Sequence, residues 1–401
     1  MFFSEYSTFV YVALFIFIYN LAKLFTNQRI VRNLIILGGN LLILLTLVKE
    51  HTLIVIAILS LLIYLSGSLL QKKKFKWFLG AILTLVITLF TIRNYPFVQE
   101  LLNESYLSVI TGPILSVQKI GLSYILFRFV HWLVESYKGS IVKSNFMTFL
   151  NYIFFFPSIL AGPIDTYQNF HYWIDNKRVK YHKSLFFAGV TRVFIGVFKT
   201  LGLVPYVISY ATDYHELLPD YSPVVAVLLS LLAYSAYIYL DFSGYSDIAI
   251  GTAYMIGIKT PENFNNPYIS ESLSEFWKRW HMTFSNFLKE YVFVPFIKLY
   301  NSIFNPKYRM LVTVLCYLST FAICGMWHGD KINFVYWGLW HGVGLSLNKI
   351  FTIKFKGKLN WSESSFYKIG SIILTFVFVT VGWVFFQYTE IELIEIYNLI
   401  I

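Results

Sequence analysis

Apolar residues run along the chain in long, nearly continuous stretches, and polar residues gather in the short gaps between them. Each stretch is close to the ~20 residues that a helix needs to cross a hydrocarbon core of ~30 Å. The pattern predicts membrane-spanning helices joined by short turns. We expect these helices over residues 8–22, 31–48, 52–70, 77–92, 105–136, 184–211, 222–258, 310–327, 332–348 and 366–388.

Two segments depart from this pattern. Residues 146–160 are apolar, but basic residues lie beyond both ends, at Lys143 and within 177–183, so both flanks are predicted to be cytoplasmic. This segment is therefore predicted to be a re-entrant hairpin, which survives at membrane depth only where protein or a water-filled cavity covers its backbone. Residues 259–309 mix prolines and charged residues with aromatic ones, which predicts short amphipathic helices at the cytoplasmic interface.

The composition agrees with a protein whose main solvent is lipid. Hydrophobic residues make up 57% of the 401 residues and charged residues only 13%, whereas soluble proteins carry about 25% charged residues. These values exclude a soluble globular protein. No repeat or linker divides the chain, so we expect one membrane-embedded domain over 1–401, with peripheral helices in 1–100, a central core in 105–350 and a last transmembrane helix at 366–388.

The net charge of +11 is distributed in a way that indicates topology. Basic residues lie in short loops after the first and third apolar stretches and before the last one, namely Lys23, Arg29, Arg32, Lys72, Lys73, Lys74, Lys76, Lys354, Lys356 and Lys358. Cytoplasmic loops carry such an excess of lysine and arginine. The N-terminus is therefore expected outside, the run from Lys72 to Lys76 is expected near lipid headgroups, and nucleic acid is not needed to explain the charge.

Three of the eight histidines directly follow a tryptophan: His281, His328 and His341. Ionisable groups at membrane depth are costly and mark candidate functional sites. Burial keeps an imidazole neutral, and a neutral imidazole is competent as a general base. The sequence contains no serine-hydrolase elbow, P-loop or His-Glu-x-x-His zinc motif, so a base that acts on a hydroxyl group favours acyl transfer from an activated ester. His328 and His341 share a Trp-His-Gly core, and we expect a turn between them near Gly329 and Asp330.

Each of these polar residues also has a plainer interpretation. A histidine beside a tryptophan can be an interfacial residue that is hydrogen-bonded to the backbone. Cys324, His328 and His341 could share a metal ion, although two histidines and a thiol in an apolar helix are weak grounds, and we expect no metal. Asp241 and Asp247 could form the proton relay of a transporter, or could only bond neighbouring hydroxyl groups.

Several motifs in a defined order suggest a known family. They are Leu160-Ala161-Gly162-Pro163-Ile164, Asp241-Phe242-Ser243-Gly244-Tyr245-Ser246-Asp247, Pro261-Glu262-Asn263-Phe264-Asn265-Asn266-Pro267-Tyr268, Phe276-Trp277-Lys278-Arg279-Trp280-His281 and Trp327-His328-Gly329. Together, within residues 119–350, they resemble the bacterial membrane-bound O-acyltransferases, the group of alginate and peptidoglycan O-acetyltransferases and the teichoic-acid D-alanyl transfer protein. The resemblance implies an all-α polytopic fold: a ring of about ten or eleven transmembrane helices, with re-entrant and interfacial helices around a central tunnel.

The resemblance also implies roles for individual residues. His328 matches the catalytic histidine of the family and would be the general base on the acceptor hydroxyl, and His281 matches the second active-site histidine of the bacterial branch. The substrate tunnel is expected to include His341 and six further residues of these motifs, namely Trp280, Trp327, Asp241, Ser243, Tyr245 and Asn265. The core at 105–350 would then be the catalytic part of the chain.

The activity that the resemblance implies is an O-acyl transfer across the bacterial cell membrane. The donor would be a cytoplasmic thioester, either acetyl-CoA or an acylated phosphopantetheine carrier protein, and no tightly bound cofactor is expected. The acceptor would be a hydroxyl group of an envelope polysaccharide or of a relay protein, either periplasmic or a small membrane protein. The motifs at 241–247 and 261–265 look like the acetyltransferases, whereas the short chain and Trp280-His281-Met282 look like the D-alanyl branch, so both acyl groups stay open. The alternative is a transporter or flippase of envelope polysaccharide without acyl chemistry.

Overall fold

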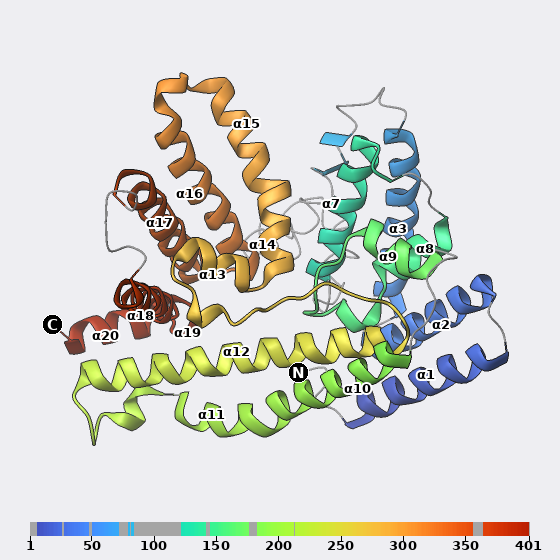
Figure 1. Cartoon of the computed structure of the whole chain (residues 1–401), viewed down its shortest axis with the longest axis horizontal. Helices are drawn as coiled ribbons and strands as arrows, with labels where there is room; N and C mark the ends of the chain where they lie inside the picture. Colours follow the sequence, from blue (N-terminus) through green and yellow to red (C-terminus); the bar gives the residue numbers. More distant parts are fainter. Residues whose placement is uncertain are drawn as a thin grey trace, which may run out of the picture. The chain divides into compact units, whose positions relative to one another are not determined.

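The structure, a computed structural model, describes residues 6–25, 28–47, 50–71, 79–80, 82–83, 122–141, 145–175, 183–211, 213–355 and 364–400 (Figure 1). Throughout this part of the chain the regular elements are helices, and no strand is found in it. The all-α class predicted from the apolar pattern is confirmed. Most of the predicted helix 77–92, residues 105–121 of the next one and the basic residues Lys72, Lys73, Lys74, Lys76, Lys356 and Lys358 lie outside the described residues.

The chain divides into two compact units. The first unit comprises Met1–Val197 and Tyr245–Pro261, and the second comprises Phe198–Gly244 and Glu262–Ile401. Helix α12 (Pro223–Met255) contributes residues to both units. The predictions of one domain and of a ring of helices around a tunnel concern both units together and stay predictions.

The described helices of the first unit are α1 (Tyr6–Phe25), α2 (Arg29–Leu47), α3 (Glu50–Leu70), α7 (Leu122–Lys138), α8 (Phe146–Ile153), α9 (Tyr167–Asp175) and α10 (Lys183–Val197). Most of them lie in predicted apolar stretches, whereas α9 was not predicted. Helix α8 has 8 residues, and at ~12 Å it is too short to cross a membrane. A 3₁₀ turn (Phe156–Ser158) follows it, and α8 packs against α9. This short, folded-back element has the geometry predicted for a re-entrant hairpin.

A buried arginine completes this hairpin. The side chain of Arg128, on α7, donates hydrogen bonds to the carbonyl oxygens of Tyr152 (2.8 Å) and Ile153 (2.6 Å). It also donates to Oγ of Ser158 over 2.7 Å. The last carbonyl groups of a helix have no partner inside it, so the guanidinium satisfies those of α8. A buried guanidinium is tolerated in an apolar environment when its N–H groups donate hydrogen bonds to acceptors, as they do here.

The second unit holds the remaining described helices. They are α11 (Val204–Ala211), the first part of α12, α13 (Leu273–Arg279), α14 (Met282–Leu288), α15 (Val294–Ile303), α16 (Arg309–His328), α17 (Ile332–Lys354), α18 (Ser365–Gly382), α19 (Val384–Gln387) and α20 (Glu390–Ile400). The block 259–309 forms only short helices, as predicted, with a π-helical turn (Lys289–Phe293) between α14 and α15. Helix α20 is an element that the apolar pattern did not predict.

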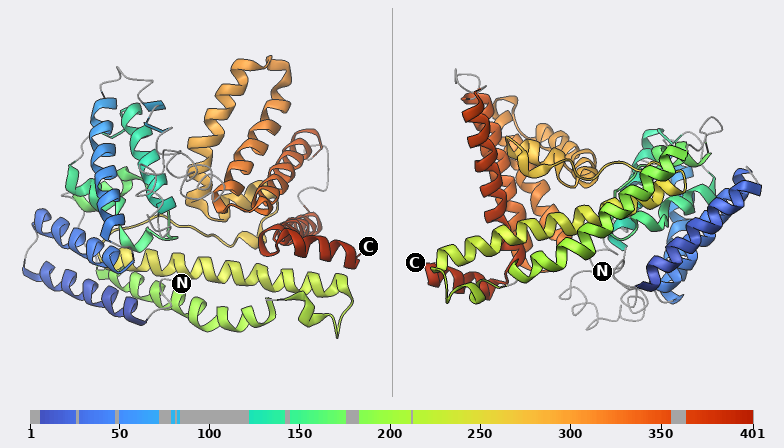
Figure 2. Two further views of the ribbon diagram at one scale, coloured as in Figure 1. Left: turned by 180° about the vertical axis from the view of Figure 1, so that it is seen from behind. Right: turned by 60° about the horizontal axis from the view of Figure 1, so that its bottom comes forward.

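Helices α16 and α17 form a hairpin that carries two of the candidate histidines, and they lie side by side (Figure 2). Helix α16 ends at His328 and α17 begins at Ile332, so the turn predicted near Gly329 is confirmed. A Cβ atom at Gly338 would overlap the carbonyl oxygen of Phe321 on the facing helix. Only glycine allows this close approach of the two backbones, and the approach sets the positions of the histidines.

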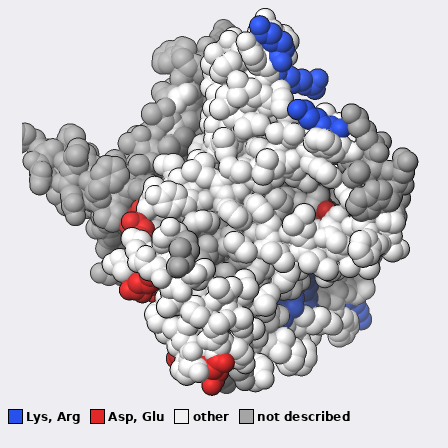
Figure 3. All heavy atoms as spheres, turned by 90° about the vertical axis from the view of Figure 1, so that its left-hand side faces the viewer, with Lys and Arg blue, Asp and Glu red and all other residues white. Residues whose placement is uncertain are grey.

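Five helical segments of the described chain are long and apolar enough to cross a membrane: Arg29–Thr46, Lys183–Ser209, Pro223–Met255, Pro306–His328 and Ser365–Gln387. Large apolar side chains on them are exposed, for example Phe194 at 72% and Leu374 at 71%. Charged side chains are sparse on the face drawn in Figure 3, which leaves a broad uncharged surface. Such a surface is a liability in water, whereas in a bilayer it meets lipid. The protein is thus an all-α membrane protein.

Candidate active site

The three histidines that follow tryptophans all lie in the second unit and are linked by shared aromatic rings. The ring centroid of Phe284 lies 4.9 Å from that of His281 and 6.4 Å from that of His328. Trp337 lies 4.9 Å from His328 and 5.0 Å from His341. Residues that are far apart in the sequence therefore form one aromatic group, called the histidine cluster below.

Local structure explains how the histidine cluster forms. His281 lies between α13 and α14 as the N-cap of α14, so that Phe284 follows about one helical turn later. His328 is the last residue of α16, and Trp337 and His341 lie on α17, the partner helix of the hairpin. One helix start and one helix hairpin thus bring the three imidazoles together.

The side chain of Asn263 holds the ring of His281. Its Oδ1 lies 3.0 Å from Nδ1 of His281. The same oxygen accepts hydrogen bonds from Oγ1 of Thr283 (2.8 Å) and from the backbone nitrogen of Thr283 (3.4 Å). One buried amide therefore contacts both the histidine and the residue two positions after it.

The backbone of His281 has a left-handed conformation, with φ at 42°. A residue with a side chain pays about 1–3 kcal/mol there, and the conformation persists only where the surroundings hold it. The backbone nitrogen of Met282 donates to the carbonyl oxygen of Asn263 (2.9 Å), and that of Asn265 donates to the carbonyl oxygen of Arg279 (2.9 Å). The two chain segments therefore run side by side and hold His281 in place.

The second ring nitrogen of His281, Nε2, is buried and has no hydrogen-bond partner among the described residues. Burial lowers the pKa of His281 well below its ordinary value of 6.5, and the nearby His328 lowers it further. The imidazole is therefore neutral near pH 7. A buried nitrogen without a partner costs free energy, which marks a position where a substrate could supply the missing group.

His328 is held in a different way. The ring is half-buried, and the rings of Trp327, Trp337 and Phe386 surround it at 4.8, 4.9 and 5.0 Å. Within the described part of the chain its side chain makes no hydrogen bond. Packing therefore positions this ring.

His341 is fully buried on α17. Nε1 of Trp277 donates a hydrogen bond to Nδ1 of His341 over 3.3 Å. An indole N–H can only donate, so Nδ1 accepts, and the proton of the neutral ring is on Nε2. That Nε2 has no partner among the residues that the structure describes. His341 thus presents a hydrogen-bond donor rather than a base.

The two tryptophans predicted at the tunnel belong to the same aromatic surroundings, whereas the predicted asparagine does not. Trp327 packs on Phe284 at 4.5 Å. Trp280 packs on Trp383 at 5.5 Å. Asn265 is exposed, and it takes part in the site through its backbone.

Helix α12 carries the remaining predicted residues, and they fall in different units. Asp241 and Ser243 belong to the second unit, and Tyr245 belongs to the first. Oδ1 of Asp241 is buried and has no partner in the described chain. Oγ of Ser243 accepts a hydrogen bond from Nζ of Lys199 over 3.3 Å. The residue between Asp241 and Ser243, Phe242, packs on His281 with ring centroids 4.7 Å apart. This part of α12 therefore borders the histidine cluster, although neither Asp241 nor Ser243 bonds a histidine in the described chain.

The second carboxylate on α12 already has a partner. Nε of Arg192 donates to Oδ1 of Asp247 over 2.8 Å, within the first unit. This ion pair gives Asp247 a structural role, whereas Asp241 lies in the second unit. The proton relay considered for a transporter thereby loses support for one of its two carboxylates.

Metal ligands do not gather in the part of the chain that the structure describes, where no group of three His, Cys, Asp or Glu side chains is placed to hold an ion. Cys316 and Cys324 are buried free thiols. The metal site considered for Cys324, His328 and His341 therefore has no support from the described side chains.

Some residues of the site were not singled out from the sequence. Asn263 lies within hydrogen-bond distance of His281, and Thr283 donates to Asn263. The rings of Phe284 and Trp337 connect the imidazoles. Asn263 stands in a motif that carries the family resemblance, but the sequence pattern does not distinguish its side chain from that of Asn265. The distinction is burial, since Asn263 is 1% exposed, and burial here depends on the tertiary structure.

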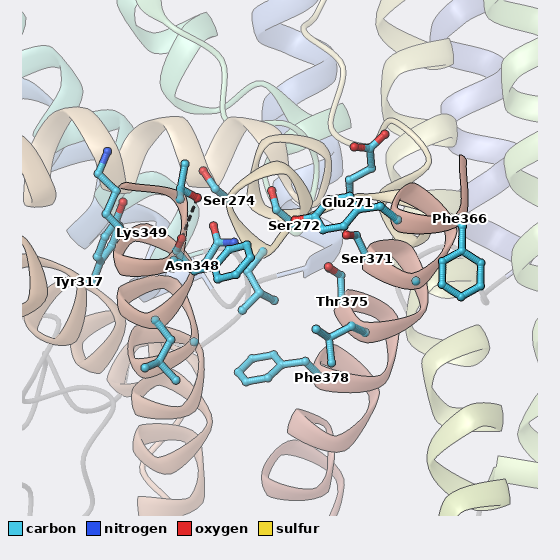
Figure 4. A pocket seen from close by; sticks show the side chains of 18 residues that line it. Glu271, Ser272, Ser274, Tyr317, Asn348, Lys349, Phe366, Ser371, Thr375 and Phe378 are labelled. Atoms are coloured by element: carbon cyan, nitrogen blue, oxygen red, sulfur yellow. Dashed lines mark hydrogen bonds between the residues drawn. The ribbon is translucent and has the colours of Figure 1, made fainter. Parts of the chain in front are cut away.

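A separate cavity of about 770 Å³ lies in the second unit between α13, α16, α17 and α18 (Figure 4). Polar side chains such as Ser272, Asn348 and Thr375 line part of it, and Phe378 lines the rest together with other apolar residues. The ring of Phe378 lies 5.9 Å from that of His341. The cavity therefore comes within one side chain of the histidine cluster but is lined by no histidine itself.

The sequence of the chain matches a known protein family over most of its length. Residues 32–394 match MBOAT, the membrane-bound O-acyltransferase family. The match includes all three histidines of the cluster and Asn263.

Individual proteins are similar over different shares of their length. The chain is 31% identical over 364 residues to the teichoic acid D-alanyltransferase of Bacillus subtilis (strain 168), an alignment that covers 86% of this chain and 88% of that protein. It is 32% identical to a probable alginate O-acetylase of Pseudomonas fluorescens, over 67% of this chain and 51% of that protein. It is 33% identical to the peptidoglycan O-acetyltransferase of Helicobacter pylori, over 62% of this chain and 45% of that protein. The chain thus spans most of the first relative and about half of the other two.

Proposed function

Because this chain belongs to the membrane-bound O-acyltransferase family, we propose that it moves an acyl group from a cytoplasmic thioester to a hydroxyl group of the bacterial cell envelope. The protein is a multi-pass membrane protein and an O-acyltransferase. The observation that carries the finer proposal is the pair of imidazoles on His281 and His328, which share contact with Phe284. The buried Nε2 of His281 has no hydrogen-bond partner among the described residues, and in the proposed reaction a substrate hydroxyl supplies one.

The reaction we propose is a base-assisted ester exchange. The acceptor hydroxyl gives its proton to an imidazole of the pair while its oxygen attacks the carbonyl carbon of the thioester. The tetrahedral intermediate then collapses, the C–S bond breaks, and the proton passes to the leaving thiolate. An ester and a free thiol result, and the imidazole is neutral again. Since a thioester is already activated, the protein contributes positioning and proton transfer.

We propose D-alanyl as the acyl group, delivered by a phosphopantetheine carrier protein. The support is the share of the relatives that aligns, since the D-alanyltransferase aligns over 88% of its length and the two acetyl-transferring relatives over 51% and 45%. Acetyl-CoA is the second candidate donor, because the acetyl-transferring relatives are as similar in identity, at 32% and 33% against 31%.

The two substrates would approach from opposite faces. Basic residues such as Lys23 and Lys354 stand in the last turns of α1 and α17. The positive-inside rule would assign these helix ends to the cytoplasm, and the N-terminus would then lie outside. The interfacial block 259–309 would meet the donor on the cytoplasmic side. The acceptor would be an envelope polysaccharide, or a relay protein that is periplasmic or a small membrane protein.

Reconstituted vesicles test this proposal. Wild-type protein in lipid vesicles receives either labelled D-alanyl carrier protein or labelled acetyl-CoA, with lipoteichoic acid as the acceptor probe, and labelled ester is counted. We expect ester from the D-alanyl donor, and a loss of about 10³-fold in His328→Ala vesicles that contain the same amount of protein. Ester from acetyl-CoA alone would establish the second donor instead. Unchanged ester formation by His328→Ala would contradict the role of the histidine pair.

The same vesicles separate the enzyme from the transporter. Movement of labelled polysaccharide across the bilayer without any covalent product would overturn the proposed reaction. Ester formation without such movement supports it.

A further inference from the structure

Asn263 is buried beside His281, and its neighbours determine the orientation of its amide group. The backbone nitrogen of Thr283 lies 3.4 Å from Oδ1 of Asn263, and Oγ1 of Thr283 lies 2.8 Å from it. A backbone N–H can only donate, so an amide NH₂ in the place of Oδ1 would set two donors against each other. The group that faces Thr283 is therefore the amide oxygen.

The same oxygen determines the tautomer of His281. Nδ1 lies 3.0 Å from Oδ1 of Asn263, and an amide oxygen can only accept, so Nδ1 carries the proton. A neutral imidazole has a single N–H, which leaves the lone pair on Nε2. This nitrogen is buried without a partner among the described residues, so the lone pair is available to a substrate.

We infer that Asn263 is a positioning residue that makes His281, through Nε2, the proton acceptor in the acyl transfer. The inference rests on the proposed function and assigns the proton to His281, whereas the family resemblance implied His328 as the general base. His328 has no comparable partner in the described chain, where packing against aromatic rings holds it.

An uncharged partner suits this task. An aspartate at position 263 would also accept from Nδ1, but its negative charge would favour the imidazolium and raise the pKa of His281. The amide selects the tautomer without adding that charge, so the ring stays a neutral base. The carbonyl oxygen of Asn263 also accepts from the backbone nitrogen of Met282 (2.9 Å) and so supports the left-handed backbone of His281. One residue thereby sets both the position and the protonation of the base.

Two substitutions distinguish the positioning role of Asn263 from a contribution to packing alone. Both are measured in the vesicle assay, with the acyl donor that the wild type uses. Asn263→Ala removes the acceptor, and we expect kcat to fall about 10²-fold with KM within about threefold, because proton transfer rather than binding is impaired. Asn263→Asp restores an acceptor, and we expect about a tenfold recovery of kcat together with an acid limb of kcat/KM that lies about one pH unit higher than in the wild type. Wild-type kcat in Asn263→Ala, or an acid limb that does not move in Asn263→Asp, would overturn the inference.

Asn286 provides the matched control. It is an exposed asparagine on α14, the helix that follows His281. Asn286→Ala changes the same residue type on the helix that His281 caps, without touching the hydrogen bond to its ring, and we expect kcat within about twofold of the wild type.

A spectroscopic measurement reads the tautomer whether or not acyl transfer occurs. The full-length protein is labelled with ¹⁵N-histidine in lipid nanodiscs, and the signals of His281 are identified by their loss in His281→Gln. We expect a protonated Nδ1 and an unprotonated Nε2 in the wild type, and growth of the opposite tautomer in Asn263→Ala. A wild-type proton on Nε2 would overturn the inference. Wild-type protein that forms no ester from either donor would instead overturn the proposed function and leave the tautomer assignment intact.

Discussion

Two regions of the second unit each bury a histidine, yet they present opposite chemistry. Beside Asn263, His281 donates from Nδ1 and keeps a bare Nε2. Beside Trp277, His341 accepts at Nδ1 and keeps its proton on Nε2. Both rings are buried, and in the described chain both Nε2 atoms lack a partner. Burial among aromatic rings therefore does not by itself make a base, because the partner of Nδ1 decides whether a lone pair or a proton faces the substrate.

The first unit extends the comparison. Arg128 is as buried as His281, at 1% and 3% exposure. Its guanidinium, however, donates to three acceptors at the end of the re-entrant hairpin. A buried polar group whose hydrogen bonds are made supports the fold, whereas one with an open nitrogen can serve a substrate.

Among the changes that test this comparison, loss of the imidazole at 281 is expected to have the largest effect. His281→Gln keeps a polar side chain but removes the lone pair of a neutral base. We expect ester formation to fall about 10³-fold, or about 4 kcal/mol of transition-state stabilisation. The measurement is the vesicle assay at equal protein content. A fall of less than about tenfold would remove the distinction between His281 and His341.

Loss of Arg128 is expected to affect stability instead. Arg128→Met leaves three acceptors without their donor, and at about 1 kcal/mol or more each we expect a loss of about 3 kcal/mol of unfolding free energy. Thermal unfolding in detergent measures it. Lys138→Met on the same helix is the control, because the exposed Lys138–Glu135 pair (2.7 Å) contributes less than about 1 kcal/mol. Equal losses in the two variants would show that the buried hydrogen bonds of Arg128 do not support the hairpin.

Acidification is expected to act on stability through His281. Because its pKa lies well below 6.5 in the folded protein, the unfolded chain binds more protons just below pH 6.5, so stability rises as pH rises towards that value. The slope is at most about 1.4 kcal/mol per pH unit for one group. Unfolding measured between pH 5 and pH 8 should show a weaker pH dependence in His281→Gln than in the wild type. The acid limb of the wild-type kcat/KM profile should lie well below pH 6.5, and a limb at pH 6.5 or above would contradict the lowered pKa.

Replacement of the second histidine is expected to be milder. His341→Gln exchanges the Nε2–H for an amide NH₂, which is also a donor. We expect ester formation within about tenfold of the wild type. His341→Leu cannot donate and should be slower than His341→Gln in the same assay. A loss in His341→Gln as deep as that in His281→Gln would break the comparison.

Filling the separate cavity is expected to have the smallest effect. Gly370 lines the cavity, and a Cβ atom there meets nothing within 4 Å, so the side chain of Gly370→Leu begins in open space. We expect ester formation within about twofold of the wild type. Gly38→Leu on α2 is the control, since a Cβ atom there also meets nothing within 4 Å. A deep loss for Gly370→Leu alone would assign the cavity to the reaction path.

The apolar pattern located most of the described helices, because bilayer thickness sets the length of an apolar stretch and that length can be read directly from the sequence. Helix α2 spans Arg29–Leu47 against a predicted 31–48, and α16 spans Arg309–His328 against 310–327. Helix α20 was missed because glutamates interrupt its apolar residues, so that it has no membrane-spanning stretch. The single domain predicted over 1–401 stays a prediction, because the two compact units are defined by contacts between distant segments.

The sequence by itself determined the class of protein, most of the described helices and the three histidines, because hydrophobic length and short motifs are local properties. Only the tertiary structure decided whether Nε2 of His281 and of His341 carries a lone pair or a proton. A tautomer depends on which atom lies about 3 Å from a ring nitrogen. That atom comes from a residue 18 positions away for His281 and 64 positions away for His341. No pattern along the chain encodes which of two asparagines, or which tryptophan, will supply it.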